Sequence, residues 1–491
     1  MWSAPSLRPG IRPAAVFLLV ALVGFGGCGR AENAAIGADA RPSVIVISVC
    51  SIRADHVSFN GYPRETTPQL ARLASDAVVF EEAVTQWPKT VPAVAALLTG
   101  RYGHSTGVMR VTIGQRLGDD EITVAEHFRD NGYATAAFIS SSALNAATNL
   151  FQQGFDLVDE TYRHTGMFEA TTTRALEWVK QARSPFFLWV HYNNAHQPYY
   201  APDAPDGLFV DDAYYDPSVR VPLNDDAEMD LEIPKDHPFR LQILRPDMHG
   251  VRPATQLKER TTELAFYIAR YDAGIFGADR RIGQLLEGVS HLLPNTIVAV
   301  VGDHGEGLGD HGYYFGHGRL PYDDVARVPF MIRPAGGTRA RRVPQPVPTF
   351  SLFPTLAEMA GLPEPDSVAA PSLASLVRGE ERAVGHVYAE SGYALEFQTT
   401  IRIDRWKLIH VPDPIDRLLM SGAEFELYDL TADPGETQNV FIDYPEVARP
   451  LQAALLSWSR GWRNSVRLPT LHSPVLDAET LKQLRSLGYI R

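Results

Sequence analysis

The sequence predicts an α/β fold, in which a doubly wound, mostly parallel sheet precedes a smaller C-terminal domain with a short antiparallel sheet. Apolar, β-branched runs of the kind that form strands buried on both faces alternate with helix-like stretches between residues 43 and 302. Near residue 384 the pattern changes to short segments typical of antiparallel strands. The chain has 491 residues, 45% of them hydrophobic, which is enough for one large core and a smaller one.

Residues 1–27 are typical of a secretory signal peptide and not of the fold. Arg8 and Arg12 precede an apolar run, AAVFLLVALVGFGG, that is too short to span a bilayer. Two small residues stand directly before Cys28, as in the lipobox of bacterial lipoproteins, whose cysteine is acylated. We therefore expect an exported chain that is anchored to a membrane of a bacterial cell envelope through Cys28. A periplasmic or secreted protein is the alternative.

The mature chain would have a single thiol and an acidic charge balance. If Cys28 is acylated, Cys50 is the remaining cysteine, which excludes a disulfide within the chain. Loss of the two signal-peptide arginines takes the formal net charge from −13 to −15. Such a charge disfavours nucleic acid and anionic lipid surfaces as partners.

After a linker at residues 28–41, buried strands and helices are predicted in turn. The strands are SVIVISV, ATAAFIS, PFFLWVHY and NTIVAVVG, at residues 43–49, 134–140, 185–192 and 295–302. The helix-like stretches lie at residues 67–77, 121–132, 168–183 and 261–289. In the longest one, apolar residues three and four apart form one stripe: Leu264, Ile268, Tyr271, Ile275, Ile282 and Leu285. Strands that alternate with helices predict the parallel, doubly wound sheet.

Residues 200–255 interrupt this alternation. They are rich in proline and aspartate without sustained periodicity, which indicates a long surface insertion near the mouth of a site. Beyond residue 384, the segments typical of antiparallel strands are HVYAESG, TTIRIDRWKLIHV and EFELYDL, and helix-like stretches follow at 446–462 and 476–489. We therefore predict one domain at 42–383, which includes the insertion, and a second at 384–491.

Reactive side chains follow three of the predicted strands. Cys50 comes directly after the first strand, His196 lies just past the third, and Asp303 and His304 follow the fourth. Ligands of an open parallel sheet bind beyond the C-terminal ends of its strands. A carboxylate beside an imidazole there suits one corner of a metal site, although such pairs also serve as capping or core hydrogen-bonding groups.

Several segments together resemble the sulfatases of the alkaline phosphatase superfamily, in order and at the usual spacing. They are ISVCSIRADHVSFNGYPRETTPQLARLASDAVVF, TVPAVAALLTGRYGHSTGV, HYNNAHQPY, VGDHGEGLGDHGYYFGHG with YDDVARVPFMIRP, and ELYDLTADPGETQN. The resemblance covers residues 42 to 440. It implies the same two-domain fold and a divalent cation, commonly calcium, held between two carboxylate clusters.

The resemblance also implies roles for individual residues. Asp303 and His304 match the second of the two metal clusters. His196 matches a histidine that contacts the sulfate ester, and His317 stands where family members place a cation near the leaving oxygen. The alternative for both of these histidines is a hydrogen-bonded structural role.

The chain departs from the family pattern at the nucleophile. The family's Cys-x-Pro-Ser-Arg segment, whose cysteine is oxidised to formylglycine, is replaced by Thr90-Val91-Pro92-Ala93-Val94. Threonine cannot yield that aldehyde, so no formylglycine is expected, and Val94 replaces the arginine that would steady the charged ester. Thr90 is either the N-cap of a helix or the attacking group, as in the phosphodiesterases and phosphoethanolamine transferases of the superfamily.

The first metal cluster is altered too. The aspartate expected after the first strand is Cys50, and its neighbour is Ser51. Calcium prefers oxygen, whereas sulfur selects a softer ion such as zinc. Cys50 is therefore either a small buried hydrophobe or a zinc ligand beside Asp303 and His304, with Thr90 or Ser51 as the fourth group.

Two classes of function remain open from the sequence. The leading hypothesis is an exported enzyme that hydrolyses or transfers a sulfate or phosphate ester of a small molecule or glycan, with Thr90 as the attacking group. The alternative is a non-catalytic relative that keeps the cleft to bind a glycan or a lipid head group. A purely structural lipoprotein is hard to reconcile with the presence of Asp303, His304, His196 and His317.

Overall fold

The computed structural model describes residues 41–109, 115–144, 151–161, 168–197, 199, 201–210, 212, 214–221, 263–392, 397–418, 420–463, 466–467 and 470–471. They belong to one compact unit, Arg41–Arg491. The predicted signal peptide, Cys28 and the predicted helix at 476–489 lie outside the described residues. Every helix within the described ranges is too short or too polar to cross a membrane.

Eight of the described strands form one large sheet, in the order β11-β2-β10-β7-β1-β6-β4-β5. Neighbours pair in parallel except β10, which is antiparallel to both β7 and β2. The strands are β1 (Ser43–Val49), β2 (Val78–Val84), β4 (Ala134–Ile139), β5 (Leu157–Asp159), β6 (Phe186–Tyr192), β7 (Thr296–Gly302), β10 (Arg327–Arg333) and β11 (Arg341–Pro348). The predicted mostly parallel sheet is confirmed.

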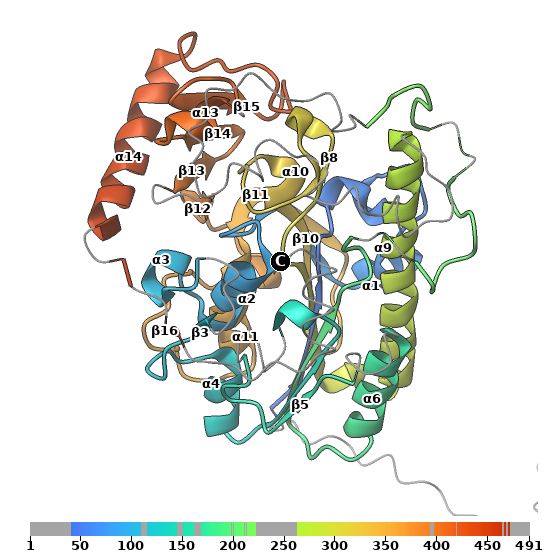
Figure 1. The fold of residues 1–491 in the computed structure, drawn as a ribbon. Coiled ribbons are helices and arrows are strands. Elements are labelled where there is room, and N and C mark those ends of the chain that lie inside the picture. Colours follow the sequence, from blue (N-terminus) through green and yellow to red (C-terminus); the bar gives the residue numbers. More distant parts are fainter. Residues whose placement is uncertain are drawn as a thin grey trace, which may run out of the picture. The chain divides into compact units, whose positions relative to one another are not determined.

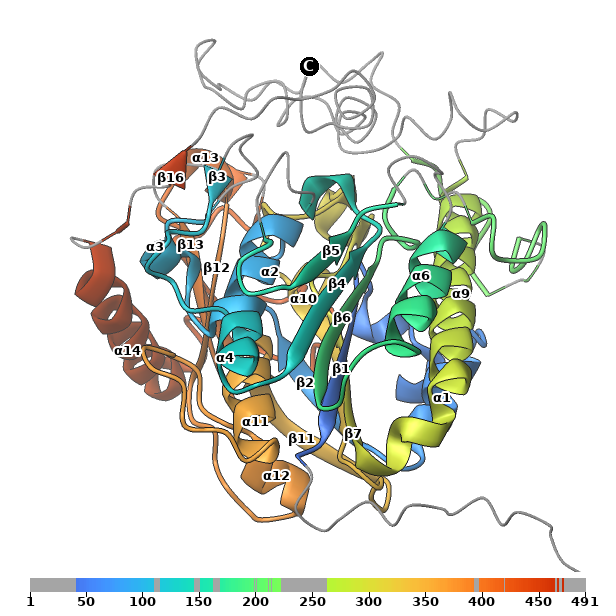
Figure 2. The ribbon, with the colours of Figure 1, turned by 90° about the horizontal axis from the view of Figure 1, so that it is seen from below.

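Helices cover both faces of this sheet (Figure 2). On one face lie α2 (Thr90–Thr99), α4 (Val124–Asp130) and α11 (Leu352–Met359), and on the other α1 (Pro68–Ala74), α6 (Phe168–Val179) and α9 (Leu264–Gly288). Alternate side chains of β1 explain the two layers: Val44 and Val46 pack on the α2 side, and Ile45 and Ile47 on the α9 side. A strand buried on both faces needs a continuous apolar run, which is what this segment provides.

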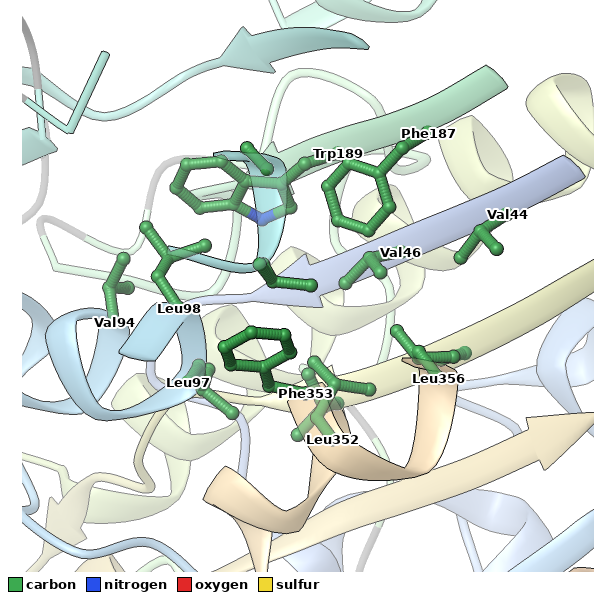
Figure 3. Packing of buried hydrophobic residues seen from close by; sticks show 14 of the residues in the cluster. Val44, Val46, Val94, Leu97, Leu98, Phe187, Trp189, Leu352, Phe353 and Leu356 are labelled. Carbon is green, nitrogen blue, oxygen red and sulfur yellow. The ribbon is translucent and has the colours of Figure 1, made fainter. Parts of the chain in front are cut away.

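Helix α2 is buried along its whole length. Leu97 and Leu98 pack between the sheet and α11, close to Trp189 and Phe353 (Figure 3). This packing fixes the helix axis, and therefore also the position of its N-terminal residue, Thr90.

The remaining predicted elements are mostly confirmed, and four strands of the large sheet were missed. Helix α9 buries Ile268, Tyr271, Ile275, Ile282 and Leu285 of the predicted stripe, while Leu264 is half-buried at its first residue. The sequence analysis did not predict β2, β5, β10 or β11, and β5 has only three residues. Two glutamates interrupt the apolar run of β2, and β10 and β11 together contain four prolines, which obscures the usual strand pattern.

A separate four-stranded antiparallel sheet follows, with the order β12-β13-β14-β15 (Figure 1). Its strands are β12 (Val387–Ser391), β13 (Gln398–Ile403), β14 (Trp406–His410) and β15 (Phe425–Asp429). Helix α14 (Pro445–Arg463) packs on it through Leu451 and Leu455. The predicted antiparallel sheet is confirmed, and the exact domain boundary near residue 384 stays a prediction.

Shorter elements complete the described part of the chain. They are α3 (Gly103–Thr106), α10 (Asp323–Ala326), α12 (Ala374–Arg378) and α13 (Pro414–Leu418), and two small antiparallel pairs, β3 (Gln115–Arg116) with β16 (Thr470–Leu471) and β8 (Gly307–Leu308) with β9 (Tyr314–Gly316). Of the predicted insertion at 200–255, only residues up to Val221 are partly described. There, the Arg64 guanidinium bonds to the Asp212 carboxylate and to the Phe209 carbonyl.

Candidate active site and metal centre

Three adjacent parallel strands, β7, β1 and β6, end at the same edge of the sheet. Val49 stands opposite both Gly302 and Tyr192, so the residues that follow these positions are neighbours. The backbone continues this pairing for one more step: Cys50 N donates to Tyr192 O at 2.8 Å, and Asp303 N donates to Val49 O at 3.2 Å. The strand ends therefore bring Cys50 and Asp303 together, although 253 positions separate them in the sequence.

The Thr90 side chain points into this cluster and does not cap its helix. Helix α2 begins at Thr90 itself, and the N-cap residue is Lys89. The Thr90 hydroxyl Oγ1 lies 3.0 Å from His304 Nε2 and 3.5 Å from Cys50 Sγ, and the residue is fully buried. The interpretation of Thr90 as an N-cap is therefore wrong. Its hydroxyl is oriented by His304, which follows the end of β7.

The imidazole of His304 has a defined tautomer. Its Nδ1 lies 2.8 Å from the carbonyl oxygen of Gly305, which can only accept, so Nδ1 carries the proton and Nε2 is free to accept. Gly305 is required here, since a side chain would collide with the Asp324 carbonyl. Complete burial lowers the pKa of His304 well below its usual value, so the ring is neutral. Histidine ligands of metals are oriented in the same way by a second hydrogen bond.

The carboxylate of Asp303 has one satisfied and one unsatisfied oxygen. Oδ1 accepts from the backbone N–H groups of Ser51, at 3.0 Å, and His304, at 2.6 Å. Oδ2 is buried and has no hydrogen-bond partner among the residues that the structure describes. Burial raises the pKa of Asp303 to about 7. A buried carboxylate oxygen without a partner is costly, which indicates that a cation normally completes this site.

Cys50 faces the same space. Its Sγ lies 3.8 Å from His304 Nε2 and 3.7 Å from Ser51 Oγ. Burial, and then the charge of Asp303, raise the pKa of the thiol well above its usual value. A nearby cation would reverse this shift, because a metal ion stabilises the thiolate.

Sequence reasoning missed one candidate ligand, His191. Cys50, His191 and Asp303 each offer one ligand atom, and these three atoms lie within 4.8 Å of one another. His191 Nδ1 bonds to Ser48 Oγ at 2.8 Å, and its buried Nε2 has no hydrogen-bond partner in the described part of the chain. The available signal was a histidine near the end of an otherwise apolar and aromatic strand, FFLWVHY.

The two other predicted histidines lie beside His304. The ring centroids of His304 and His317 are 4.1 Å apart, and those of His196 and His317 are 5.2 Å apart. His317 Nδ1 lies 3.1 Å from the Glu306 carboxyl, a partner that the sequence analysis did not identify. Burial lowers the pKa of His196 to about 4. The structure therefore gathers all six predicted residues around one buried site.

A positive charge directly precedes Thr90 in the chain. Val94 is completely buried in the core, so its side chain contributes only apolar packing. Lys89 is half-buried, and after burial itself its charge contributes to the lowered pKa values of His196 and His304. The lysine thus lies within electrostatic range of the site, where an anionic ester would need a cation.

Comparison with known proteins agrees with this architecture. The family model described as Sulfatase matches residues 42–362, and the model described as N-sulphoglucosamine sulphohydrolase, C-terminal, matches residues 309–460. A Delta 4,5-hexuronate-2-O-sulfatase of Bacteroides thetaiotaomicron is 25% identical over 449 residues, which cover 86% of this chain and 88% of the relative. An arylsulfatase of Clostridium perfringens is 24% identical over 467 residues, which cover 82% of this chain and 90% of the relative.

Solved structures have the same fold. One solved chain, in complex with its substrate D-glucosamine-2-N,6-O-disulfate, superposes on this structure with a TM-score of 0.66 at 20% identity. The superposition covers 87% of this chain and 99% of the other. The phosphonate monoester hydrolase of Agrobacterium radiobacter superposes with a TM-score of 0.63 at 20% identity, covering 86% and 96%. At these identities the likeness concerns the fold alone. Because the Sulfatase model matches well over half of the 491 residues, the chain belongs to the sulfatase family, a family of sulfuric ester hydrolases.

Proposed function

We propose that the chain is a metal-dependent hydrolase of sulfate esters, in which Thr90 takes the place of the formylglycine nucleophile. The observation that carries this proposal is the position of the Thr90 hydroxyl, 3.0 Å from His304 Nε2 and 3.5 Å from Cys50 Sγ. It lies at the N-terminus of a ten-residue helix, where backbone N–H groups and the helix dipole favour an anion. The relatives named as sulfatases support a sulfate ester as the substrate.

We infer that the metal is zinc. The donors are Cys50 Sγ, His304 Nε2 and the Asp303 carboxylate, whose Oδ2 is buried without a partner among the described residues, and Thr90 or His191 would be the fourth. Calcium requires a shell of oxygen ligands, and this cluster offers sulfur and nitrogen instead. Zinc is held in proteins by four-coordinate sets of sulfur, nitrogen and carboxylate oxygen.

A zinc ion at this position would lower the pKa of the Thr90 hydroxyl. His304 is a poor base by itself, since burial holds its pKa well below its usual value. The Thr90 hydroxyl would lose its proton to solvent water, and Thr90 Oγ1 would attack the sulfur atom. The bond from sulfur to the alcohol oxygen would break, and the sulfate would remain on Thr90. His317 would give a proton to the departing oxygen. Attack of water on the threonine sulfate would then release inorganic sulfate and restore Thr90.

Elemental analysis beside a panel of sulfate and phosphate esters tests the proposal. We expect the purified chain to retain zinc and to hydrolyse a sulfate ester. Thr90→Ala should lose turnover by about four orders of magnitude or more, as other enzymes do without their nucleophile. Thr99→Ala is the matched control, since Thr99 is a buried threonine of the same helix whose hydroxyl bonds only to the Ala95 carbonyl within the described contacts.

The alternative function predicts a different result. A wild-type chain that turns over no ester faster than Thr90→Ala would be a non-catalytic relative that binds a glycan or a lipid head group. If the chain turns over phosphate esters but no sulfate ester, Thr90 would still be the proposed nucleophile, and the substrate would be a phosphate ester instead.

We further propose that the chain is exported and anchored through an acylated Cys28. The support is the sequence alone: the two arginines, the apolar run and the small residues before the cysteine. Mass spectrometry of the N-terminal peptide of the mature protein should show a lipidated Cys28. An unmodified Cys28 inside a longer N-terminal peptide would contradict the anchor.

A further inference from the structure

A second group of buried polar side chains lies next to the candidate active site. Arg319 follows His317 by two positions, and its Nη2 donates to Asp416 Oδ1 of α13 at 2.7 Å. Gly392, at the end of β12, donates its N–H to the Gly318 carbonyl at 3.1 Å. These contacts join the loop that carries His317 to the C-terminal sheet.

The polar atoms of this group are only partly satisfied. Arg319 and Asp416 are 4% and 3% exposed, and Gln398 is fully buried. The side-chain oxygen Oε1 of Gln398 accepts a hydrogen bond from Ser391 Oγ at 3.3 Å. Arg319 Nε and Nη1, Asp416 Oδ2 and Gln398 Nε2 have no hydrogen-bond partner among the residues described. Each such atom carries a desolvation cost, so the cluster is poorly explained as a purely structural ion pair.

Arg333 shows what a structural arginine looks like in the same chain. It is 7% exposed, its Nε donates to Asp76 Oδ2 at 2.7 Å, and its Nη1 donates to the carbonyls of Leu293 and Pro334. Arg319, by contrast, makes one described hydrogen bond and leaves two nitrogens without one. The difference indicates that part of the Arg319 guanidinium is kept for a ligand.

The Asp416 carboxylate lies beside Gly392, at the end of β12. Among the described residues, the atoms nearest to a Cβ built on Gly392 would be Gln398 N at 3.8 Å and Asp416 Oδ2 at 4.0 Å, both at ordinary van der Waals distance. The backbone of Gly392 has a φ of 106°, in the left-handed region that favours glycine. The Asp416 oxygen that lacks a partner among the described residues therefore lies beside the end of β12.

We propose that Arg319, Asp416 and Gln398 form a subsite for neighbouring hydroxyl groups of a sugar ring, whose sulfate ester lies at Thr90. This inference rests on the proposed ester hydrolysis and adds its substrate class. A hydroxyl both donates and accepts, so one group can donate to Asp416 Oδ2 while it accepts from Arg319 or Gln398. A second anionic group fits less well, because Asp416 already balances the Arg319 charge.

The test compares sulfate esters with and without hydroxyl groups. The probes are 4-nitrophenyl sulfate and a panel of O-sulfated methyl glucosides and methyl galactosides. Arg319→Lys retains the positive charge beside Asp416 but loses the planar set of donors, and Arg333→Lys is the matched control. We expect the wild type to favour at least one sulfated glycoside in KM. In Arg319→Lys and Asp416→Asn, the kcat/KM ratio of that glycoside to 4-nitrophenyl sulfate should fall about tenfold, as expected for one lost charged hydrogen bond.

The outcomes separate the subsite from the proposed function. An equal loss of kcat/KM on both kinds of ester would mean that Arg319 has only a structural role, and would overturn the subsite. A wild type that prefers no glycoside over 4-nitrophenyl sulfate would overturn it as well. If the wild type hydrolyses no ester, the proposed function fails, and titration of the panel into wild type and Arg319→Lys then decides the subsite by affinity alone. Equal affinity, or binding to neither, would again overturn the subsite.

Discussion

The Thr90 hydroxyl and the His304 imidazole meet at 3.0 Å, although 214 positions separate the two residues in the sequence. His304 Nδ1 is held by the Gly305 carbonyl, so the second nitrogen of the ring faces Thr90. The pair joins the first residue of a fully buried helix to the end of a central strand. A threonine in this position is therefore part of the site, and its orientation is set by tertiary packing.

The identity of the metal should follow the residue at position 50. Cys50→Ser replaces sulfur by a weaker hydroxyl donor, so we expect the variant to release zinc. Cys50→Asp should shift the preference toward calcium or magnesium, because a carboxylate is a hard ligand. Elemental analysis after dialysis against equal concentrations of the three ions measures this. Thr99→Ala, which leaves the cluster intact, should bind as the wild type does. Zinc retained by Cys50→Ser would show that Cys50 is only a buried apolar residue.

Packing of α2 against α11 should determine the stability of the site. Leu98 is 5% exposed and belongs to the core shown in Figure 3. Leu98→Ala removes apolar contacts and leaves a cavity, so the free energy of unfolding should fall by about 2 to 5 kcal/mol. Urea denaturation followed by circular dichroism measures the change. Ile122→Ala, at a side chain that is 43% exposed, is the control and should cost much less. Similar losses for the two variants would contradict the importance of this packing.

A buried carboxylate on α9 should make stability depend on pH. Asp279 accepts from the backbone N–H groups of Gln69 and Leu70, both at 2.8 Å, at the start of α1. Burial raises its pKa from 3.8 to about 7 in spite of these bonds. Between these two values the folded state binds the proton more tightly than the unfolded state, so the stability that this group contributes is highest below pH 4 and falls as the pH rises through 7.

The variant Asp279→Asn isolates this contribution. It cannot ionise, so the difference in unfolding free energy between wild type and variant should change steadily between pH 4 and pH 7 and be flat above it. Urea titrations at several pH values measure the difference. Asp76→Asn, at a partly exposed carboxylate in the same region, gives the background. A difference that does not vary with pH would mean that Asp279 ionises normally.

The sequence was sufficient to predict which residues of the site lie at the strand ends. Cys50 and Asp303 could be predicted as neighbours because parallel strands end at one edge of a sheet. His191 was missed since its contribution depends on the register of β1 against β6, a long-range pairing that no local pattern specifies. The position of β10, antiparallel within the parallel sheet, is equally a matter of long-range pairing.

Local reasoning also failed at the start of α2. Threonine is a favoured N-cap, and the sequence alone does not distinguish the N-cap from the first helical position. The structure places Lys89 at the N-cap and leaves the Thr90 hydroxyl for His304. Which of the two residues occupies the N-cap is therefore decided by the tertiary partner and not by the propensity of threonine.

The last prediction concerns a positive charge that would attract an anionic ester. Val94 is completely buried in the core, whereas Lys89 is half-buried and its charge contributes to the lowered pKa values of His196 and His304. If Lys89 attracts the anionic ester, Lys89→Gln should raise KM about tenfold or more, which corresponds to roughly 1.4 kcal/mol of lost attraction. The effect should shrink at high ionic strength, because salt screens a partly exposed charge.

Lys180→Gln, at an exposed lysine of the same charge, is the control and should leave KM unchanged. Val94→Arg should not rescue the loss, since an arginine inside this core would be buried without a partner and would destabilise the fold. Steady-state kinetics at two salt concentrations measure the effect: a KM that is the same for wild type and Lys89→Gln would remove the lysine from the site.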